Sequence, residues 1–566
     1  MARPVSGPAP AGPATPDGSV VDQASPARPS WWRPEWRRLA WPAGFAGAAM
    51  VLFFAYLRLS NTYPENSDEA NLGLQAWDML HGNLLLHGWM LSDVSFFTTE
   101  LPQYMLLELI HGLNNGTFHL AAAMTYTLAL LLTAGLARGR ADGRQGVAQV
   151  LIAGGIMLAP QLGVGVFILL LTVGHFGTSV PLLVTLLVLD RAKPHWSVPV
   201  LAGVLLAWAS IADALVLLVG VAPLAAVALV RAAGALMARR GWRPVGYHLS
   251  LVVAAGAAAV VWSRAGATVR ALGGYSVHRV PFQVIAWSGL ATHARITGLS
   301  MLAVFGANFQ GVHGEPAVAF AALHLIGVAV AAVGLIVTVG LFFRRSLVDQ
   351  VMALAIVASL VLYLGSNFSN GILNGREIAV VLPFSAALAG RTLGPWLARQ
   401  RVPEASARPP WFRRSTASFL LLALAGYAAG LGYQLTQPTV PAANTRLASW
   451  LSAHHLTRGL SGYWQASSVT LDSQDQVTIR AITNYLSGMV PYQWESKASW
   501  YDWRTQYANF VVLDDQPGYF ITWTPTHEIT DVFGSPALTY HTGSYTVMVW
   551  HKNLLLTLHQ WEQSAR

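Results

Sequence analysis

Long apolar runs recur along the whole chain, with short polar segments between them. A helix that crosses the hydrocarbon core of a bilayer needs about 20 predominantly apolar residues. By this criterion the pattern predicts an α-helical polytopic membrane protein with about eleven spans, of which the fourth and fifth are short. The predicted spans are 39–58, 118–137, 147–170, 177–190, 197–211, 213–230, 246–263, 317–343, 348–365, 377–395 and 416–436.

Three polar segments outside the predicted spans are long. Two are loops, at 59–117 and 264–316, and the third is the C-terminal segment 437–566, which is long enough for a small domain. The pattern therefore predicts a transmembrane domain over 36–436 and a separate C-terminal domain.

The C-terminal segment differs in pattern from the rest of the chain. Runs rich in β-branched residues predict strands at 509–513 and 545–550, and the run 445–451 predicts a helix. We therefore expect the C-terminal domain to be of mixed α/β structure.

The composition agrees with a membrane protein. Of the 566 residues, 54% are hydrophobic and 11% are charged, whereas soluble proteins average roughly 25% charged residues. The net charge of +9 fits basic cytoplasmic loops, so we expect membrane lipid and no nucleic acid as a partner. Residues 1–35 are rich in Pro, Ala, Gly and Ser, which predicts a disordered tail. The chain contains no cysteine, which excludes disulfides and thiol chemistry.

Basic residues orient the predicted spans. The first external loop has no Lys or Arg between Arg58 and Arg138. With a cytoplasmic N-terminus the alternation follows the positive-inside rule, and an odd number of spans puts the C-terminal domain outside the cytoplasm. The predicted cytoplasmic connections contain Arg138, Arg140, Arg144, Arg191, Lys193, Arg231, Arg239, Arg240, Arg243, Arg344, Arg345, Arg391, Arg399, Arg401, Arg408, Arg413 and Arg414.

Asp68 and Glu69 follow the first span closely. Carboxylates near hydrocarbon are costly, which makes this pair a candidate functional site. Asn66 or Ser67 can cap a helix that begins at Asp68, and the helix dipole favours acids in its first turn. The pair therefore has two interpretations, as catalytic acids at the outer leaflet or as helix-capping charges. An apolar face would lay the helix along the membrane surface, and it consists of Leu72, Ala76, Met79 and Leu80.

Other external residues are candidates for a second acid or an acceptor contact. Asp93 is the first choice, and Glu100 in the same loop is a further one. Asp213, between two apolar runs, either caps a helix or faces the same cavity as Asp68. His175, at an external turn, is either structural or part of the site. Two acids near one site can divide the roles of base and metal ligand, so a divalent metal is possible but unassigned.

A phosphate ligand is expected among the external arginines. Arg376 lies at the outer end of a predicted span, where the positive-inside rule does not explain it. Arginine binds phosphate with two parallel hydrogen bonds. Glu377 is adjacent, but neighbours on a helix do not face each other, so it need not neutralise Arg376. A snorkelling or ion-paired arginine is the alternative, and the other external candidates are Arg264, Arg270, Arg279 and Arg295.

Common nucleotide and hydrolase motifs are absent. The sequence has no P-loop, Rossmann glycine pattern, HExxH or GxSxG in a usable context. No cofactor is therefore assigned. The C-terminal segment is rich in tryptophan, which either binds sugar rings or fills a core or a membrane interface. These residues are Trp450, Trp464, Trp494, Trp500, Trp503, Trp523 and Trp550.

Six short stretches carry a resemblance to a known family: Asp68–Glu69, Ala76–Gly82, His175–Thr178, Gly375–Pro383, Gly462–Trp464 and Phe533–Pro536. Together they resemble the GT-C superfamily of membrane glycosyltransferases, and within it the bacterial protein-mannosyltransferase and aminoarabinose-transferase-like group. The resemblance covers nearly the whole chain after residue 35. One departure concerns a Pro-Pro dipeptide of relatives, where this chain reads Thr99-Glu-Leu-Pro102, and it leaves the donor and acceptor classes open.

This resemblance implies a function. Members take a sugar from a polyprenyl-phosphate donor outside the cytoplasm, so a hexosyl- or pentosyltransferase with a cell-envelope glycan, lipid or protein as acceptor is expected. It implies Asp68 as general base or acceptor-orienting acid, Glu69 as its neighbour, and Arg376 as donor-phosphate ligand. The alternative is a polytopic lipid or glycan transporter or flippase, although internal repeats and midplane polar residues, typical of transporters, are not conspicuous.

Overall fold

The fold is seen in a computed structural model, which divides into two compact units, 1–50 and 51–566. The first unit contains the start of the first helix, and the other helices and strands of the described residues lie in the second unit. The predicted disordered tail, 1–35, lies outside the described residues. The structure describes residues 36–171, 174–398, 410–485, 488–515 and 526–565.

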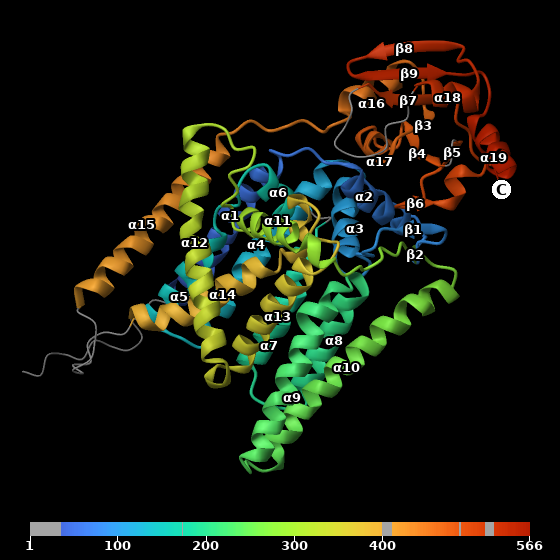
Figure 1. Ribbon diagram of the computed structural model, residues 1–566. Helices are drawn as coiled ribbons and strands as arrows, with labels where there is room; N and C mark the ends of the chain where they lie inside the picture. Colours follow the sequence, from blue (N-terminus) through green and yellow to red (C-terminus); the bar gives the residue numbers. More distant parts are fainter. Residues whose placement is uncertain (1–35, 172–173, 399–409, 486–487, 516–525, 566) are drawn as a thin grey trace, which may run out of the picture. The chain divides into compact units, whose positions relative to one another are not determined.

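Helices dominate the chain up to residue 435 (Figure 1). The first are α1 (Trp36–Ser60), α2 (Ser67–Leu80), α3 (Glu100–His111), α4 (Gly116–Arg138), α5 (Gly143–Met157), α6 (Val164–Leu169), α7 (Ser179–Arg191) and α8 (Ser197–Ala212). A π-helix, η2 (Leu217–Val221), continues into α9 (Ala222–Met237). After it come α10 (Trp242–Ala271), η3 (Trp287–Gly289), α11 (Leu290–Val304), α12 (Glu315–Gly340), η4 (Phe342–Arg344), α13 (Leu347–Leu364), η5 (Ile372–Ile378), α14 (Val381–Ala398) and α15 (Pro410–Leu435).

Every predicted span overlaps a helix, and the described residues support a polytopic membrane protein. Seven helices are long and apolar enough to cross a membrane, or eight when the bent pair η5 and α14 is one span. The seven lie in α1, α4, η2 with α9, α10, α12, α13 and α15. The count of about eleven therefore stays a prediction.

Three predicted boundaries differ from the structure. The predicted span 147–170 is two helices, because α5 ends at Met157 and α6 begins at Val164. The predicted span 377–395 begins as a 3₁₀ helix and bends by 59° before α14. α10 continues to Ala271, so the predicted external loop begins later than residue 264.

Small residues allow α14 to occupy the centre of the transmembrane domain. Its first ten residues, Val381–Gly390, are all buried. A Cβ atom at Gly390 would lie 2.6 Å from the carbonyl oxygen of Gln149 on α5. A Cβ atom at Gly334 on α12 would lie 2.7 Å from the Cα atom of Ala389. Glycine commonly allows membrane helices to approach this closely. Because η5 directly precedes α14, the tight packing of α14 also limits where η5 can lie.

Connections predicted to be cytoplasmic meet at one end of this domain. Arg391 at the far part of α14 donates to the carboxylates of Asp349 and Asp190 at 2.5 and 2.8 Å. Its Nη1 atom donates to the carbonyl oxygen of Leu136 at 2.9 Å. Arg231 donates to Gln350 at 2.6 Å. Segments that the charge pattern assigns to one side of the membrane are thus in contact.

The C-terminal segment combines helices and strands, as its pattern predicted, and its being a separate domain stays a prediction. Its elements are α16 (Thr445–Ala453), β3 (Arg458–Ser461), α17 (Tyr463–Asp472), β4 (Thr478–Tyr485), β5 (Gly488–Pro491), β6 (Ser496–Lys497), η6 (Ala498–Tyr501), β7 (Phe510–Asp514), α18 (Thr526–Phe533), β8 (Leu538–Thr542), β9 (Tyr545–Val549) and α19 (Leu554–Ala565). The predicted strands correspond to β7 and β9, and the predicted helix to α16.

One mixed sheet of six strands, in the order β5-β4-β3-β7-β9-β8, forms the centre of this domain. Side chains of successive strand residues point to opposite faces. Phe510 and Val512 of β7 pack with α16 and α17, whereas Val511 and Leu513 pack with α18 and α19. The helices therefore cover both faces of the sheet.

A small second sheet joins all three predicted external regions. Its order is β2-β1-β6, where β1 is Trp89–Leu91 in the first loop and β2 is Ser276–Val277 in the second. β1 pairs parallel with β2, and antiparallel with β6 of the C-terminal domain, with Met90 opposite both Ser276 and Ser496. An ion pair between Lys497 and Asp78, 2.9 Å apart, adds to this junction.

Candidate functional site

The start of α2 holds both acids of the Asp68–Glu69 pair. The backbone N–H of Asp68 donates to the side chain of Asn66 at 2.8 Å. The N–H of Asn66 donates to Glu69 Oε2 at 2.9 Å, which completes a capping box. Asn66, one of the two predicted caps, is therefore confirmed, and α2 begins at Ser67, one residue before the predicted start. Glu69 is fully buried and performs the capping, while Asp68 is half-buried and free of that role.

Asp68 contacts the C-terminal domain. The Tyr463 hydroxyl, at the start of α17, lies 2.6 Å from Asp68 Oδ1 and 2.5 Å from Glu495 Oε2. Asn71, one turn after Asp68 on α2, donates to the Tyr463 oxygen and to Glu495 Oε2, each at 3.3 Å. Ser467 donates to the Asn71 side-chain oxygen at 2.8 Å. Two carboxyl groups from distant segments thus share one phenol.

Burial raises the pKa of Asp68, while the Arg376 guanidinium and the Tyr463 hydrogen bond act in the opposite direction. Burial, and then the charge of Asp68, hold the pKa of Glu69 well above its ordinary value. Asp68 is partly exposed, whereas Glu69 is fully buried and engaged in the cap. Of the two acids, Asp68 is therefore the better base.

Arg376 lies on η5, next to the bend before α14. Its guanidinium Nε is 4.0 Å from Glu377 Oε1, and its side chain is 31% exposed. The charges of Asp68, Asp93 and Glu69 also act on it. The sequence argument that Glu377 need not neutralise Arg376 assumed a regular helix; in the 3₁₀ turn the two side chains do form an ion pair. Arg376 nevertheless remains partly open.

His175 connects Glu377 to Asp213. Its Nδ1 lies 2.8 Å from Asp213 Oδ2, and its Nε2 lies 2.8 Å from Glu377 Oε2. Thr178 donates to Asp213 Oδ2 at 2.5 Å, and the N–H of Leu215 donates to Oδ1 at 2.8 Å. Burial by itself lowers the pKa of His175, but the two carboxylates outweigh it and raise the pKa well above its ordinary value. His175 is thus an imidazolium that holds η5 in place.

Each of the two interpretations of Asp213 agrees with one of its contacts. Its acceptance of the Leu215 N–H is a cap, and its bond to His175 links it to the site. Asp93, the predicted second acid, is half-buried and lies within the field of His175, Glu377 and Arg376. Burial raises the pKa of Asp93, whereas the His175 and Arg376 cations lower it.

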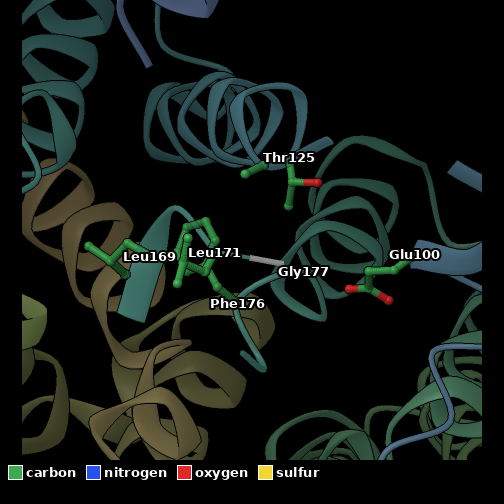
Figure 2. Close-up of a pocket in the computed structure, with 7 residues that line it drawn as sticks. Glu100, Thr125, Leu169, Leu171, Phe176 and Gly177 are labelled. Atoms are coloured by element: carbon green, nitrogen blue, oxygen red, sulfur yellow. The ribbon is translucent and has the colours of Figure 1, made fainter. Parts of the chain in front are cut away.

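Glu100 faces an internal cavity. It is 4% exposed, and burial raises its pKa to about 7. In Figure 2 Gly177 lies between Glu100 and the apolar side chains of Leu171 and Phe176. A Cβ atom at Gly177 would collide with the Glu100 carboxyl, so a larger residue there would displace that carboxyl group. The cavity is lined by Glu100, Ala122, Thr125, Leu169, Leu171, Phe176 and Gly177.

The structure thus gathers most sequence-predicted residues into one polar cluster. Its members are Asp68, Glu69, Asp93, Glu100, His175, Asp213 and Arg376. The other candidate cations, Arg264, Arg270, Arg279 and Arg295, are exposed. Within the described ranges, no group of three or more His, Asp or Glu side chains has the arrangement of a metal site.

Sequence reasoning missed Tyr463 and Glu495 as site residues, and it underestimated Asn71 and Glu377. The spacing of Asn71 from Asp68, about one helical turn, would have placed both on one face of α2. Nothing in the sequence around Glu495 distinguishes it from a solvated acid. Its position became evident only through the pairing of β6 with β1.

Comparisons with known proteins are sparse. No protein-family model matches the chain, and no curated protein matches it. Two cryo-EM structures of the R1389S mutant of the arabinofuranosyltransferase AftD from Mycobacteria, class 1 and class 2, are among the solved structures that match this chain. Their TM-scores are 0.40 and 0.39, their identities 13% and 15%, and they cover 90% and 89% of this chain. The chain spans 41% of the length of either structure.

Proposed function

We propose that this protein is an integral-membrane glycosyltransferase. It moves a hexose or pentose from a polyprenyl-phosphate donor to a hydroxyl group of a cell-envelope glycan, lipid or protein. What supports the proposal is that Asp68 at the start of α2 and Arg376 on η5, far apart in the sequence, come near enough for the charge of each to act on the pKa of the other. A half-buried base beside a partly open arginine is the pair of groups that this transfer needs.

In the proposed reaction the acceptor oxygen attacks the anomeric carbon of the sugar. A new C–O bond forms, and the bond between that carbon and the phosphate oxygen breaks. Asp68 takes the hydroxyl proton. Polyprenyl phosphate leaves with the bonding electron pair, and Arg376 stabilises its negative charge. No nucleotide takes part in the proposed reaction, and no metal ion is assigned a role in it.

The lipid donor determines where the proposed reaction occurs. A polyprenyl chain keeps its phosphate at the membrane surface, and α2 begins seven residues after α1 ends at Ser60. We propose that this surface is extracytoplasmic, with the N-terminus in the cytoplasm, because the arginine-rich connections meet at the Arg391 end of the same domain. Reporter fusions after Gln437 that are active only in the cytoplasm would overturn this orientation.

The test uses the purified full-length protein in lipid nanodiscs. A panel of radiolabelled polyprenyl-phosphate pentoses and hexoses is combined with envelope glycan, lipid and protein acceptors, with and without a metal chelator. Wild-type protein should release polyprenyl phosphate in step with labelled product, and Asp68→Asn should not. If no donor reacts and the protein instead moves labelled donor across vesicle membranes, the transporter alternative replaces the proposal.

A further inference from the structure

The C-terminal domain places two of its own side chains in the candidate site. Tyr463 is 4% exposed and Glu495 is 3% exposed. They come from α17 and from the residue before β6, and they meet over Asp68.

We propose that Glu495 and Tyr463 are positioning residues for Asp68. Glu495, in its protonated form, donates to the Tyr463 oxygen, and the Tyr463 hydroxyl donates to Asp68 and holds that carboxylate in place. This inference rests on the proposed function for its catalytic consequence, but the state of the three groups can be measured independently.

The count of protons is the first argument. A tyrosine hydroxyl has one hydrogen to donate and two lone pairs that accept. Two carboxyl oxygens lie within 2.6 Å of this hydroxyl, and one hydrogen cannot serve both. With two ionised carboxylates, one of them would face an oxygen lone pair at hydrogen-bond distance with no proton between them. One carboxyl group of the pair must therefore be protonated.

The surroundings decide which carboxyl group holds this proton. Asp68 has the Arg376 cation nearby, which favours its charged form. The Tyr463 hydrogen bond favours the charged form of Asp68 and of Glu495 alike, so it does not distinguish them. Glu495 is more deeply buried, and burial followed by the charge of Asp68 holds its pKa well above its ordinary value. Other titratable groups near the pair are Glu69, beside Asp68, and Tyr492, beside both acids. Neither supplies a cation to Glu495, so Glu495 holds the proton and Asp68 stays ionised.

The backbone at Glu495 gives an independent argument. Its φ angle is +46°, in the left-handed region that non-glycine residues rarely adopt. Such strain persists where surrounding contacts impose it, and it tends to occur at functional sites. Here the following residues, Ser496 and Lys497, are held by pairing with β1 and by the ion pair to Asp78. The small sheet thus turns the Glu495 side chain toward Tyr463.

The first measurement detects the proton directly and needs no activity. Infrared difference spectra compare wild-type protein in lipid at neutral pH with Glu495→Gln. The carbonyl stretch of one protonated carboxylic acid should be lost in the variant. Asp531→Asn, which changes an exposed acid of the same domain, is the matched control and should remove only a carboxylate band. A difference spectrum without the acid band means that Glu495 is ionised, and it overturns the proposal.

The second measurement is the pH dependence of transfer. If the working form needs protonated Glu495, activity falls as pH rises through the pKa of this group. An amide cannot ionise but can still donate to Tyr463, so Glu495→Gln should move this alkaline fall upward by about one pH unit or more. Tyr463→Phe removes the bridge, and should lower kcat by roughly 10²-fold with little change in the donor KM.

The outcomes separate the two proposals. An alkaline fall at the same pH in wild type and Glu495→Gln, in variants that melt like wild type, rejects the positioning role. Absence of transfer in wild type rejects the proposed function, while the infrared result still decides whether Glu495 holds a proton.

Discussion

Two arginines on one bent helix pair have opposite surroundings. Arg391, on α14, has a side chain that is 14% exposed and makes ion pairs with Asp190 and Asp349. It also donates to the carbonyl oxygen of Leu136. Arg376, on η5, is 31% exposed, and its charged neighbour within 4.0 Å in the described residues is Glu377. His175 already occupies the other oxygen of that carboxylate.

The difference teaches which charge is structural. Arg391 has its donors satisfied by three separate elements, so it can hold helices together and has little left to bind a ligand. Arg376 is surrounded by the field of several carboxylates but has few direct partners, which is the condition of a group kept for a ligand. A charged ligand such as phosphate would complete its hydrogen bonding.

The largest expected effect is at Asp68. Asp68→Asn should lower transfer by about 10²–10⁴-fold without loss of folding, because loss of a general base removes proton transfer only. In the wild type, the base works when ionised, so activity should fall as pH drops through the raised pKa of Asp68. Rates and melting temperatures are measured side by side with Glu69→Gln, the neighbouring capping acid. Full activity of Asp68→Asn would remove it from the reaction.

The next effect tests the structural end of the comparison. Arg391→Ala should destabilise the protein by about 3–5 kcal/mol, because it leaves Asp190 and Asp349 buried without their cation. Thermal unfolding in lipid measures this loss. Protein that stays folded should keep a wild-type donor KM. A variant that melts like wild type would contradict the structural role.

A smaller effect is expected at Arg376. Arg376→Ala should weaken donor use by roughly 10–100-fold, which corresponds to about 1.5–3 kcal/mol for a hydrogen bond to a charged group. Arg376→Lys should recover part of it, because an ammonium cannot form the two parallel bonds. Melting should change by less than with Arg391→Ala, since His175 still pairs with Glu377. An unchanged donor KM would transfer the phosphate role to another cation.

The smallest effect is expected at Glu65, a buried acid just before α2. Within the described residues, no cation acts on its pKa. Burial, and then the neighbouring Asp472 carboxyl, raise the pKa of Glu65 to about 8. The folded state then binds a proton that the unfolded state has lost, so stability should fall as pH rises from about 4.5 to about 8. Glu65→Gln should flatten this slope and be more stable at pH 8 by about 1–2 kcal/mol. The melting temperatures of both proteins are measured across this pH range. The same pH dependence in wild type and Glu65→Gln would contradict the prediction.

Parts of the site could be predicted from interactions between residues close in the sequence. A cap just before α2 and two acids in its first turn follow from neighbouring residues alone. The structure has Asn66 as the cap and begins α2 at Ser67, one residue before the predicted start. The apolar runs likewise predicted the positions of the membrane helices. Two breaks in the predicted spans could not be predicted from the sequence. The gap between α5 and α6 and the bend before α14 depend on how the helices pack.

The partners of each side chain depend on contacts between distant segments. Tyr463 and Glu495 reach Asp68 because β6 pairs with β1, a contact between the first external loop and the C-terminal domain. Likewise, Glu377 could be judged only as a helical neighbour of Arg376, whereas the 3₁₀ turn and His175 set its actual role.

By itself, then, the sequence determined the membrane helices, the α/β character of the C-terminal segment and the acids that begin α2. Each of these follows from hydrophobicity and capping, which act between residues close in sequence. Only the tertiary structure decided that Arg376 is open while Arg391 is saturated, and that Asp68 shares a phenol with Glu495. Those outcomes depend on which distant groups come within hydrogen-bond distance, and no local pattern encodes that.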